Sequence, residues 1–178
     1  MTIYCIDASA LVLYVTSQTN NTDLSSALKN IEQERAEGIM STVTIAEFHR
    51  AITRISSEDN ADKFVAWIQE SPIRIIPITL EIALLASVKK QSYAKAKQPF
   101  AWGDAFCLAT GLIHHADVLI TSDKEFDNVN EISIMKVWTG WSVRYVGSMR
   151  PKIPMGSVMT VNFPSSVMMT FHQHSNNQ

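Results

Sequence analysis

The chain begins with the apolar run Ile3-Tyr4-Cys5-Ile6, and Asp7 follows it directly. A short β-branched run of this kind is typical of a buried strand. A second run, Val118–Thr121, is likewise followed by a carboxylate, at Asp123. In open parallel sheets the working groups lie just beyond the carboxyl ends of the strands. The two stretches therefore predict a parallel sheet with an acidic residue at each of two strand ends.

Segments of helical periodicity separate the strand-like runs over the first 138 residues. Strands are predicted at residues 3–6, 39–42, 73–78, 118–121 and 132–137. Helices are predicted at residues 23–37, 44–55, 61–70, 80–88 and 102–115, and Gly38 is expected to cap the first of them. This alternation predicts an α/β sandwich with a mostly parallel central sheet of about five strands.

Charge is distributed unevenly along the chain. Residues 1–131 carry all 17 acidic residues and 11 basic ones, for a net charge of −6, whereas residues 132–178 carry four basic residues and no acidic one. The α/β pattern also stops near residue 138, so we expect one domain at 1–138 and a C-terminal extension at 139–178. For the extension, disorder or loose docking is favoured over an added hairpin or a partner-binding arm. We expect it to be dispensable for chemistry.

Nothing in the sequence indicates a membrane or secreted protein. No segment approaches the roughly 18 uncharged apolar residues of a membrane-spanning helix, and no basic region precedes the first strand. The only cysteines, Cys5 and Cys107, lie inside apolar segments. Two buried thiols in a reducing compartment are the simplest interpretation. We therefore expect a cytoplasmic protein.

Four carboxylates fall at predicted strand ends or near helix starts: Asp7, Glu47, Asp104 and Asp123. Taken singly, each has a structural explanation as a cap, a turn residue or a complement to a helix dipole. Their agreement in one architecture predicts that they converge on one edge of the sheet. Clustered carboxylates repel one another, and a hard divalent cation supplies the compensation. Ligands that are all oxygen favour Mg²⁺ or Mn²⁺, and one or two such ions can support phosphodiester cleavage.

Four segments carry a more specific resemblance. They are, in chain order, Ile6–Leu11, Ser41–Glu47, Trp102–Ala105 and Thr121–Phe126. As an ordered set they resemble the PIN domains, particularly the VapC-type toxins of bacterial toxin–antitoxin pairs, over about residues 1–138. The resemblance implies a PIN-like α/β/α sandwich and a metal-dependent endoribonuclease, a hydrolase that cuts RNA. It further implies the toxin of a type II pair with a small antitoxin as partner, and we also expect a homodimer.

The resemblance assigns metal binding and catalysis to four residues: Asp7, Glu47, Asp104 and Asp123. The first three correspond to the core acidic residues of the family, and the last corresponds to a more variable fourth. Ser9 matches a small polar residue that supports the site by hydrogen bonding. Thr121 matches the polar residue at the end of the fourth strand. Ala8 departs from the Thr often found there, with little consequence for the site.

Arg50 and Arg54 share a helix face with Glu47, opposite the apolar stripe of that helix. They are candidates for contact with the phosphate backbone of RNA. A solvated helix face with internal ion pairs is an equally weighted alternative.

Three other functions compete with the toxin hypothesis. A HAD-type phosphatase requires a second Asp two residues after the first, and Ser9 occupies that position. A catalytically degenerate PIN module that binds RNA or protein has no reason to retain four repelling carboxylates. A PIN nuclease that processes RNA outside a toxin pair remains open, although the small size, without an accessory RNA-binding domain, favours the toxin.

Overall fold

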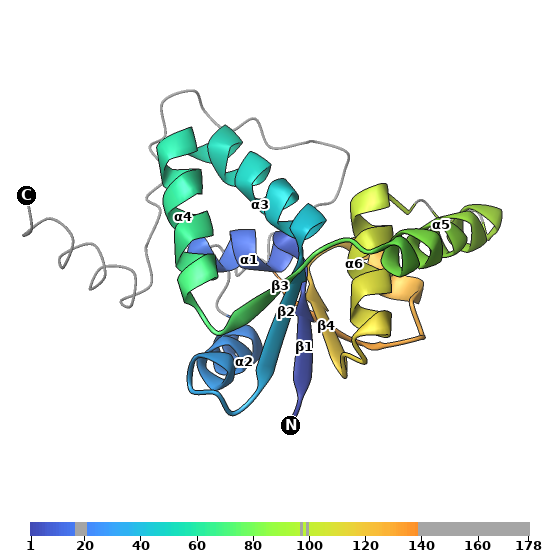
Figure 1. Cartoon of the computed structure of the whole chain (residues 1–178), viewed down its shortest axis with the longest axis horizontal. Coiled ribbons are helices and arrows are strands. Elements are labelled where there is room, and N and C mark those ends of the chain that lie inside the picture. Colours follow the sequence, from blue (N-terminus) through green and yellow to red (C-terminus); the bar gives the residue numbers. More distant parts are fainter. Residues whose placement is uncertain (17–20, 97, 99, 139–178) are drawn as a thin grey trace, which may run out of the picture.

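A computed structural model of the chain describes residues 1–16, 21–96, 98 and 100–138. Its centre is a five-stranded sheet with the strand order β3-β2-β1-β4-β5, in which every neighbouring pair is parallel (Figure 1). The strands are β1 (Ile3–Ile6), β2 (Glu37–Ser41), β3 (Ile73–Ile76), β4 (Val118–Thr121) and β5 (Ser133–Lys136). The predicted parallel sheet of about five strands is confirmed.

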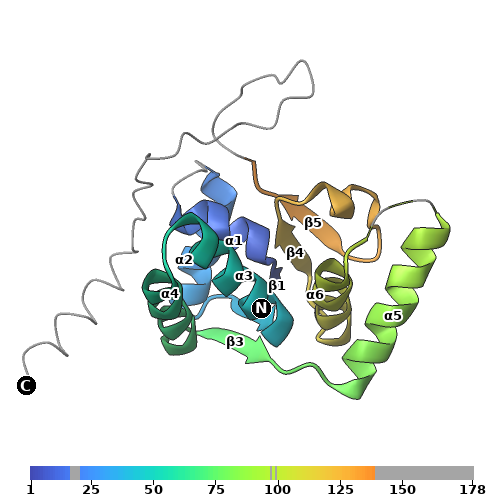
Figure 2. The same ribbon diagram turned by 90° about the horizontal axis from the view of Figure 1, so that it is seen from above.

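Helices cover both faces of the sheet (Figure 2). One face packs against α1 (Ala8–Val15), α2 (Thr22–Glu32), α3 (Thr42–Ile55) and α4 (Glu58–Glu70), and the other against α5 (Leu80–Lys95) and α6 (Trp102–Ile113). Successive strand residues point to opposite faces. Cys5 therefore joins the core under α5 and α6, whereas Ile6 joins the core under α1 to α4. The α/β/α sandwich that the resemblance implied is confirmed.

The strand order creates a switch point between β1 and β4. From β1 the chain builds outward through β2 to β3, and it then returns to add β4 and β5 on the other side of β1. In open α/β sheets, ligands bind in the crevice outside the carboxyl ends of the strands at such a point. Asp7 directly follows β1, and Asp123 follows β4 by two residues. The topology thus brings both carboxylates to the edge where ligands bind in this class of fold.

The helix α1 was missed by the sequence prediction. Its eight residues are nearly all apolar, and five of them are buried, so they show no polar face from which a helical period is recognised. The short 3₁₀ helix η1 (Lys124–Asn128) was also not predicted. Asp7 caps α1 and Asp123 caps η1, so both carboxylates also start a helix.

The prediction that Gly38 caps the helix expected at residues 23–37 is wrong. That helix, α2, ends at Glu32, and Gly38 lies inside β2. A Cβ atom at Gly38 would lie 2.9 Å from the Cδ1 atom of Ile31. The glycine is therefore explained by the close packing of α2 on the sheet, and the turn between them instead contains Glu34 with a φ of 54°.

The predicted helix near residues 80–88 is present as α5 and extends to Lys95. Its buried face is formed by Ile82, Ala86 and Tyr93. Three of the residues from which the helix was predicted, Leu80, Leu84 and Val88, are exposed. They lie at spacings of four residues, so they share one side of the helix.

Two further expectations concern the chain as a whole. Cys5 and Cys107 are buried free thiols, as predicted, with their Sγ atoms 4.0 Å apart. Among the residues that the structure describes, no helix is both long and apolar enough to cross a membrane. The extension predicted for residues 139–178 lies outside the described residues.

Candidate active site

Asp7 is held in place by the ends of β1 and β4. Its backbone N–H donates to the carbonyl oxygen of Ile120 at 2.9 Å, which ties the start of α1 to β4. Its Oδ2 atom accepts hydrogen bonds from the hydroxyls of Ser9 at 2.5 Å and Thr121 at 2.8 Å, and from the backbone N–H of Ser9 at 3.3 Å. Only 4% of Asp7 is exposed. These bonds fix one orientation of a buried carboxylate.

The two hydroxyls also position the loop after β4. The backbone N–H of Ser122 donates to Ser9 Oγ, and that of Asp123 donates to Thr121 Oγ1, both at 2.9 Å. Asp123 Oδ1 in turn accepts from the backbone N–H of Glu125 at 2.9 Å, which caps η1. Ser9 and Thr121 therefore connect Asp7 with the loop that carries Asp123.

Glu47 reaches this edge from α3. The helix begins at Thr42, two residues earlier than predicted, so Glu47 lies in its second turn. The side chain is half-buried, and its carboxylate packs directly on the α-carbon of Gly103 in the first turn of α6. A Cβ atom at position 103 would overlap that carboxylate. Gly103 is therefore what allows Glu47 to approach α6.

Asp104 lies beside Gly103 in the first turn of α6 and is 8% exposed. A hydrogen bond joins its carboxyl group to that of Glu125. Glu125 Oε2 also accepts from the backbone N–H of Ala101 at 2.7 Å, at a helix start that has no side-chain cap of its own. Glu125 is thus a fifth acidic group at this edge, which the sequence prediction did not select.

Several carboxyl groups at this edge have raised pKa values. Burial raises the pKa of Asp104 to about 9, with further contributions from the hydrogen bond to Glu125 and the charges of Asp7 and Asp123. Burial likewise raises the pKa of Glu47, and Asp7 and Asp123 raise it further, while Arg50 opposes them. Burial also raises the pKa of Asp7, in spite of its hydrogen bonds. The four predicted carboxylates therefore lie within one electrostatic cluster.

The cluster is not arranged as a finished coordination shell. Within the described part of the chain, no three side chains of His, Cys, Asp or Glu are placed to hold one metal ion. The oxygen donors themselves suit a hard divalent cation, and a cation would relieve the repulsion that adds to the raised pKa values of Glu47 and Asp104.

A comparison with known families identifies the family of the chain. The sequence profile of the PIN domain matches residues 4–132, which is most of the chain. The chain belongs to the PIN domain family. A search of curated proteins gave no match.

Solved structures share the fold of this PIN domain. The VapBC2 complex of Rickettsia felis, bound to a promoter DNA fragment, aligns with a TM-score of 0.62 and 12% identity over 76% of this chain and 98% of that one. VapBC-1 of nontypeable Haemophilus influenzae gives 0.56 and 20%, over 76% and 98%. VapC20 of Mycobacterium tuberculosis, described as a toxin that cleaves the sarcin–ricin loop, gives 0.55 and 12%, over 74% and 98%. At these identities the likeness shows a common fold.

The two arginines of α3, Arg50 and Arg54, are both exposed. Arg50 is close enough to lower the pKa of Glu47 against the effect of burial. Neither Arg50 nor Arg54 forms an ion pair with another described residue.

The raised pKa values predict that the metal-free PIN domain loses stability as the pH rises from about 4, the ordinary carboxyl range, to about 9. In this window the folded chain binds more protons than the unfolded chain, so the free energy of unfolding falls with rising pH. Urea unfolding in the presence of a chelator measures this slope. Asp104→Asn should flatten it, whereas Asp59→Asn on the exposed side of α4 should not. A free energy of unfolding that rises across the window contradicts the prediction.

Gly103→Ala is predicted to displace Glu47 without unfolding the domain. The overlap falls on the end of a flexible side chain, and Ala is favoured over Gly in a helix by about 1 kcal/mol. We therefore expect stability to change by no more than about that amount, while the pKa of Glu47 falls toward its ordinary range. Carbon-13 NMR titration of the Glu carboxyl groups measures the shift. Gly111→Ala, in the same helix, should leave Glu47 unchanged, and an unchanged pKa in the Gly103 variant would refute the contact.

Proposed function

We propose that this PIN domain is a Mg²⁺- or Mn²⁺-dependent endoribonuclease and the toxin of a type II toxin–antitoxin pair. One observation carries the proposal. Asp7, Glu47, Asp104 and Asp123 come from four separate parts of the chain at the switch point of the sheet, and the charges of Asp7 and Asp123 add to the effect of burial in raising the pKa values of Glu47 and Asp104. Burying such a cluster costs stability, and a bound cation would compensate the repulsion between the carboxylates. A degenerate module that binds RNA or protein would gain nothing from it.

The same four residues would hold the cation. Carboxylate ligands without His or Cys favour Mg²⁺ or Mn²⁺ over softer metals. When bound, the cation would polarise the scissile phosphate and activate the attacking water. Ser9 and Thr121 would orient Asp7 toward it, because both hydroxyls donate to the Oδ2 atom of Asp7.

The exposed arginines supply a place for the substrate. Arg50 and Arg54 lie one turn apart on α3, on the helix that carries Glu47. Guanidinium groups in this position would bind the phosphates of an RNA strand and direct it across the carboxylates. Contacts of this kind position the backbone and leave the choice of sequence to other groups.

The toxin assignment rests on the structures that share the fold. Several of them are described as VapBC or toxin–antitoxin complexes, including VapBC of Salmonella typhimurium and a complex from Klebsiella pneumoniae. An acidic site of this kind would attract a basic side chain of an antitoxin, which would block the carboxylates. A PIN nuclease that processes RNA outside a toxin pair is the alternative, and it shares the chemistry.

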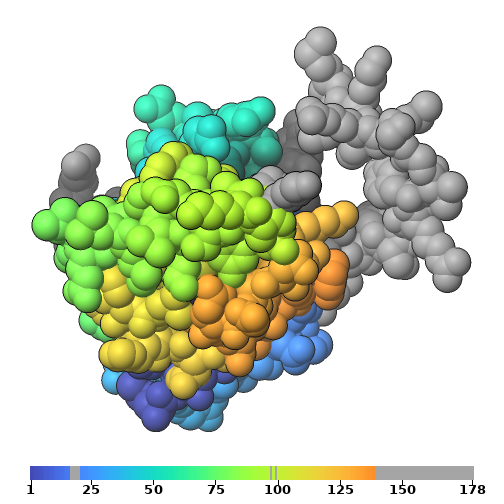
Figure 3. Space-filling model, turned by 90° about the vertical axis from the view of Figure 1, so that its right-hand side faces the viewer, coloured from blue at the N-terminus to red at the C-terminus, as the bar shows by residue number. Residues whose placement is uncertain are grey.

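A homodimer is supported by an apolar stripe on α5. Leu80, Leu84 and Val88 are 75%, 60% and 58% exposed. They lie on the helix that runs along the outer face of the domain, shown in green in Figure 3. A second copy would remove these side chains from water.

The two buried free thiols support the reducing cytoplasm as the place of action.

Asp7→Asn and Asp104→Asn should each lower RNA cleavage by more than about a hundredfold, because losing a ligand costs more than the 10–100-fold typical of its outer partners. Thr121→Val removes one hydrogen bond to Asp7 and should fall within that smaller range. Asp59→Asn is the control. Cleavage of a labelled RNA, with circular dichroism to verify folding, measures the effect.

Cleavage should stop with EDTA and return with Mn²⁺. Full activity in a folded Asp7 variant, or cleavage that resists EDTA, would show that the carboxylates do not hold a catalytic metal.

The toxin assignment predicts that expression of the active chain arrests growth and that co-expression of a small neighbouring antitoxin restores it. Asp104→Asn should be harmless, because it would lose cleavage. Colony counts under an inducible promoter measure the difference. Unimpaired growth with an extract that still cleaves RNA in a metal-dependent manner would favour the RNA-processing alternative.

A further inference from the structure

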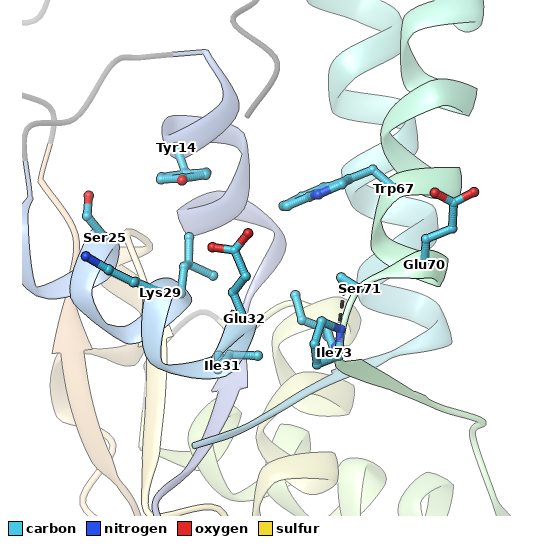
Figure 4. Close-up of a pocket in the computed structure, with 11 residues that line it drawn as sticks. Tyr14, Ser25, Lys29, Ile31, Glu32, Trp67, Glu70, Ser71 and Ile73 are labelled. Atoms are coloured by element: carbon cyan, nitrogen blue, oxygen red, sulfur yellow. Dashed lines mark hydrogen bonds between the residues drawn. The ribbon is translucent and has the colours of Figure 1, made fainter. Parts of the chain in front are cut away.

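A groove of about 440 Å³ lies on the side of the sheet covered by α1, α2 and α4 (Figure 4). It is formed by one side of each of these helices and by the residues that lead into β3. The rings of Tyr14 and Trp67 flank it, and the Glu32 side chain points into the space between them. Leu28, Ile31 and Ile73 supply apolar walls. The groove lies at the amino end of β3, whereas the carboxylate cluster lies at the carboxyl ends of the strands.

The charges of the groove favour a cationic occupant. Two carboxylates, Glu32 and Glu70, and one ammonium group, Lys29, line it. Burial raises the pKa of Tyr14, and the nearby Glu32 carboxylate raises it further. Aromatic rings beside a carboxylate bind apolar segments that also carry a positive charge.

The last described residues of the chain lie beside helix α2, which lines the groove. Asn21, the N-cap of α2, donates from Nδ2 to the carbonyl oxygen of Lys136 at 3.2 Å. The end of β5 is therefore fixed to the start of α2. That helix supplies five of the groove residues, from Ser25 to Glu32. The residues that follow Trp138 thus begin within one helix length of the groove.

The residues after Trp138 include the basic and aromatic side chains that would suit this groove. Residues 139–178 contain Arg144, Arg150 and Lys152 and no acidic residue. The part nearest the domain, residues 141–146, reads Trp-Ser-Val-Arg-Tyr-Val. In an extended segment, Trp141, Val143 and Tyr145 would share one side and Arg144 would lie on the other. The eight residues from 139 to 146 span up to about 26–29 Å, more than the roughly 16 Å length of α2.

We propose that residues 141–146 dock in this groove of the same molecule. Trp141, Val143 and Tyr145 contact the apolar walls, and Arg144 pairs with the exposed Glu32 at the mouth. Docking removes the aromatic side chains of groove and segment from water. It leaves the carboxylate edge open, so the proposal is independent of the nuclease assignment.

A photo-cross-linking residue in place of Trp141 tests the proposal in the full chain. After irradiation of p-benzoylphenylalanine at that position, mass spectrometry should find it joined to peptides of α1, α2 or α4 that line the groove. The product should have the mass of one chain. A mixture of unlabelled and nitrogen-15-labelled chains should give no mixed product. Mixed products would instead identify a second copy as the occupant, and absence of groove cross-links would leave the segment undocked; either result overturns the proposal.

Charge reversal supplies the matched variants. Arg144→Glu should lower the cross-link yield about two- to fivefold, the range expected for an exposed ion pair. Adding Glu32→Lys should restore it, because the pair is rebuilt with opposite signs. Arg150→Glu makes the same charge change six residues later and should leave the yield unchanged. Equal losses in both arginine variants would reduce the effect to net charge and refute the pairing. RNA cleavage by all of these variants should match that of the unaltered chain.

Discussion

The hydrogen bonds at Asp7 are the constraint on which the rest of the site depends. Asp7 ends β1, caps α1 and accepts from a residue at the end of β4, so one carboxylate joins three elements. Ser9 and Thr121 donate to it and at the same time accept from the backbone of the loop after β4. Removing the carboxylate would take away the acceptor that both hydroxyls share, at a point where Thr121 is fully buried. The position of Asp123 therefore follows from that of Asp7.

Hydrogen bonding at Asp7 does not offset the cost of burying so many acids at one edge. Burial still raises the pKa of Asp7, although both hydroxyls and the backbone of α1 donate to it. At Asp104 burial is joined by a hydrogen bond to Glu125 and by the charges of three neighbouring carboxylates, Asp7, Asp123 and Glu125, and all of these raise its pKa. The domain thus departs from the rule that local preferences agree with the fold, and it does so at its candidate site.

The sequence predicted the strand ends well because apolar runs followed by a carboxylate are local features. Asp7 and Asp123 were selected in this way, and Glu47 and Asp104 were selected by their places near predicted helix starts. The structure brings all four into one electrostatic cluster. The helix α1 was missed because burial on nearly every side erases the polar face that a period requires. The close approach of Glu47 to Gly103, like the contact between Glu125 and Asp104, depends on how separate helices pack. No spacing within one element contains that information.

At the start of α6, the Glu125 carboxyl group both accepts a hydrogen bond from the helix backbone and interacts with Asp104. Ala101 provides no side-chain cap, and its backbone N–H donates instead to Glu125 Oε2, which comes from η1. The same carboxyl group holds Asp104. The hydrogen bond from Ala101 to Glu125 Oε2 does not involve the Asp104 side chain, so it holds the start of α6 whichever partner the Asp104 carboxyl group takes.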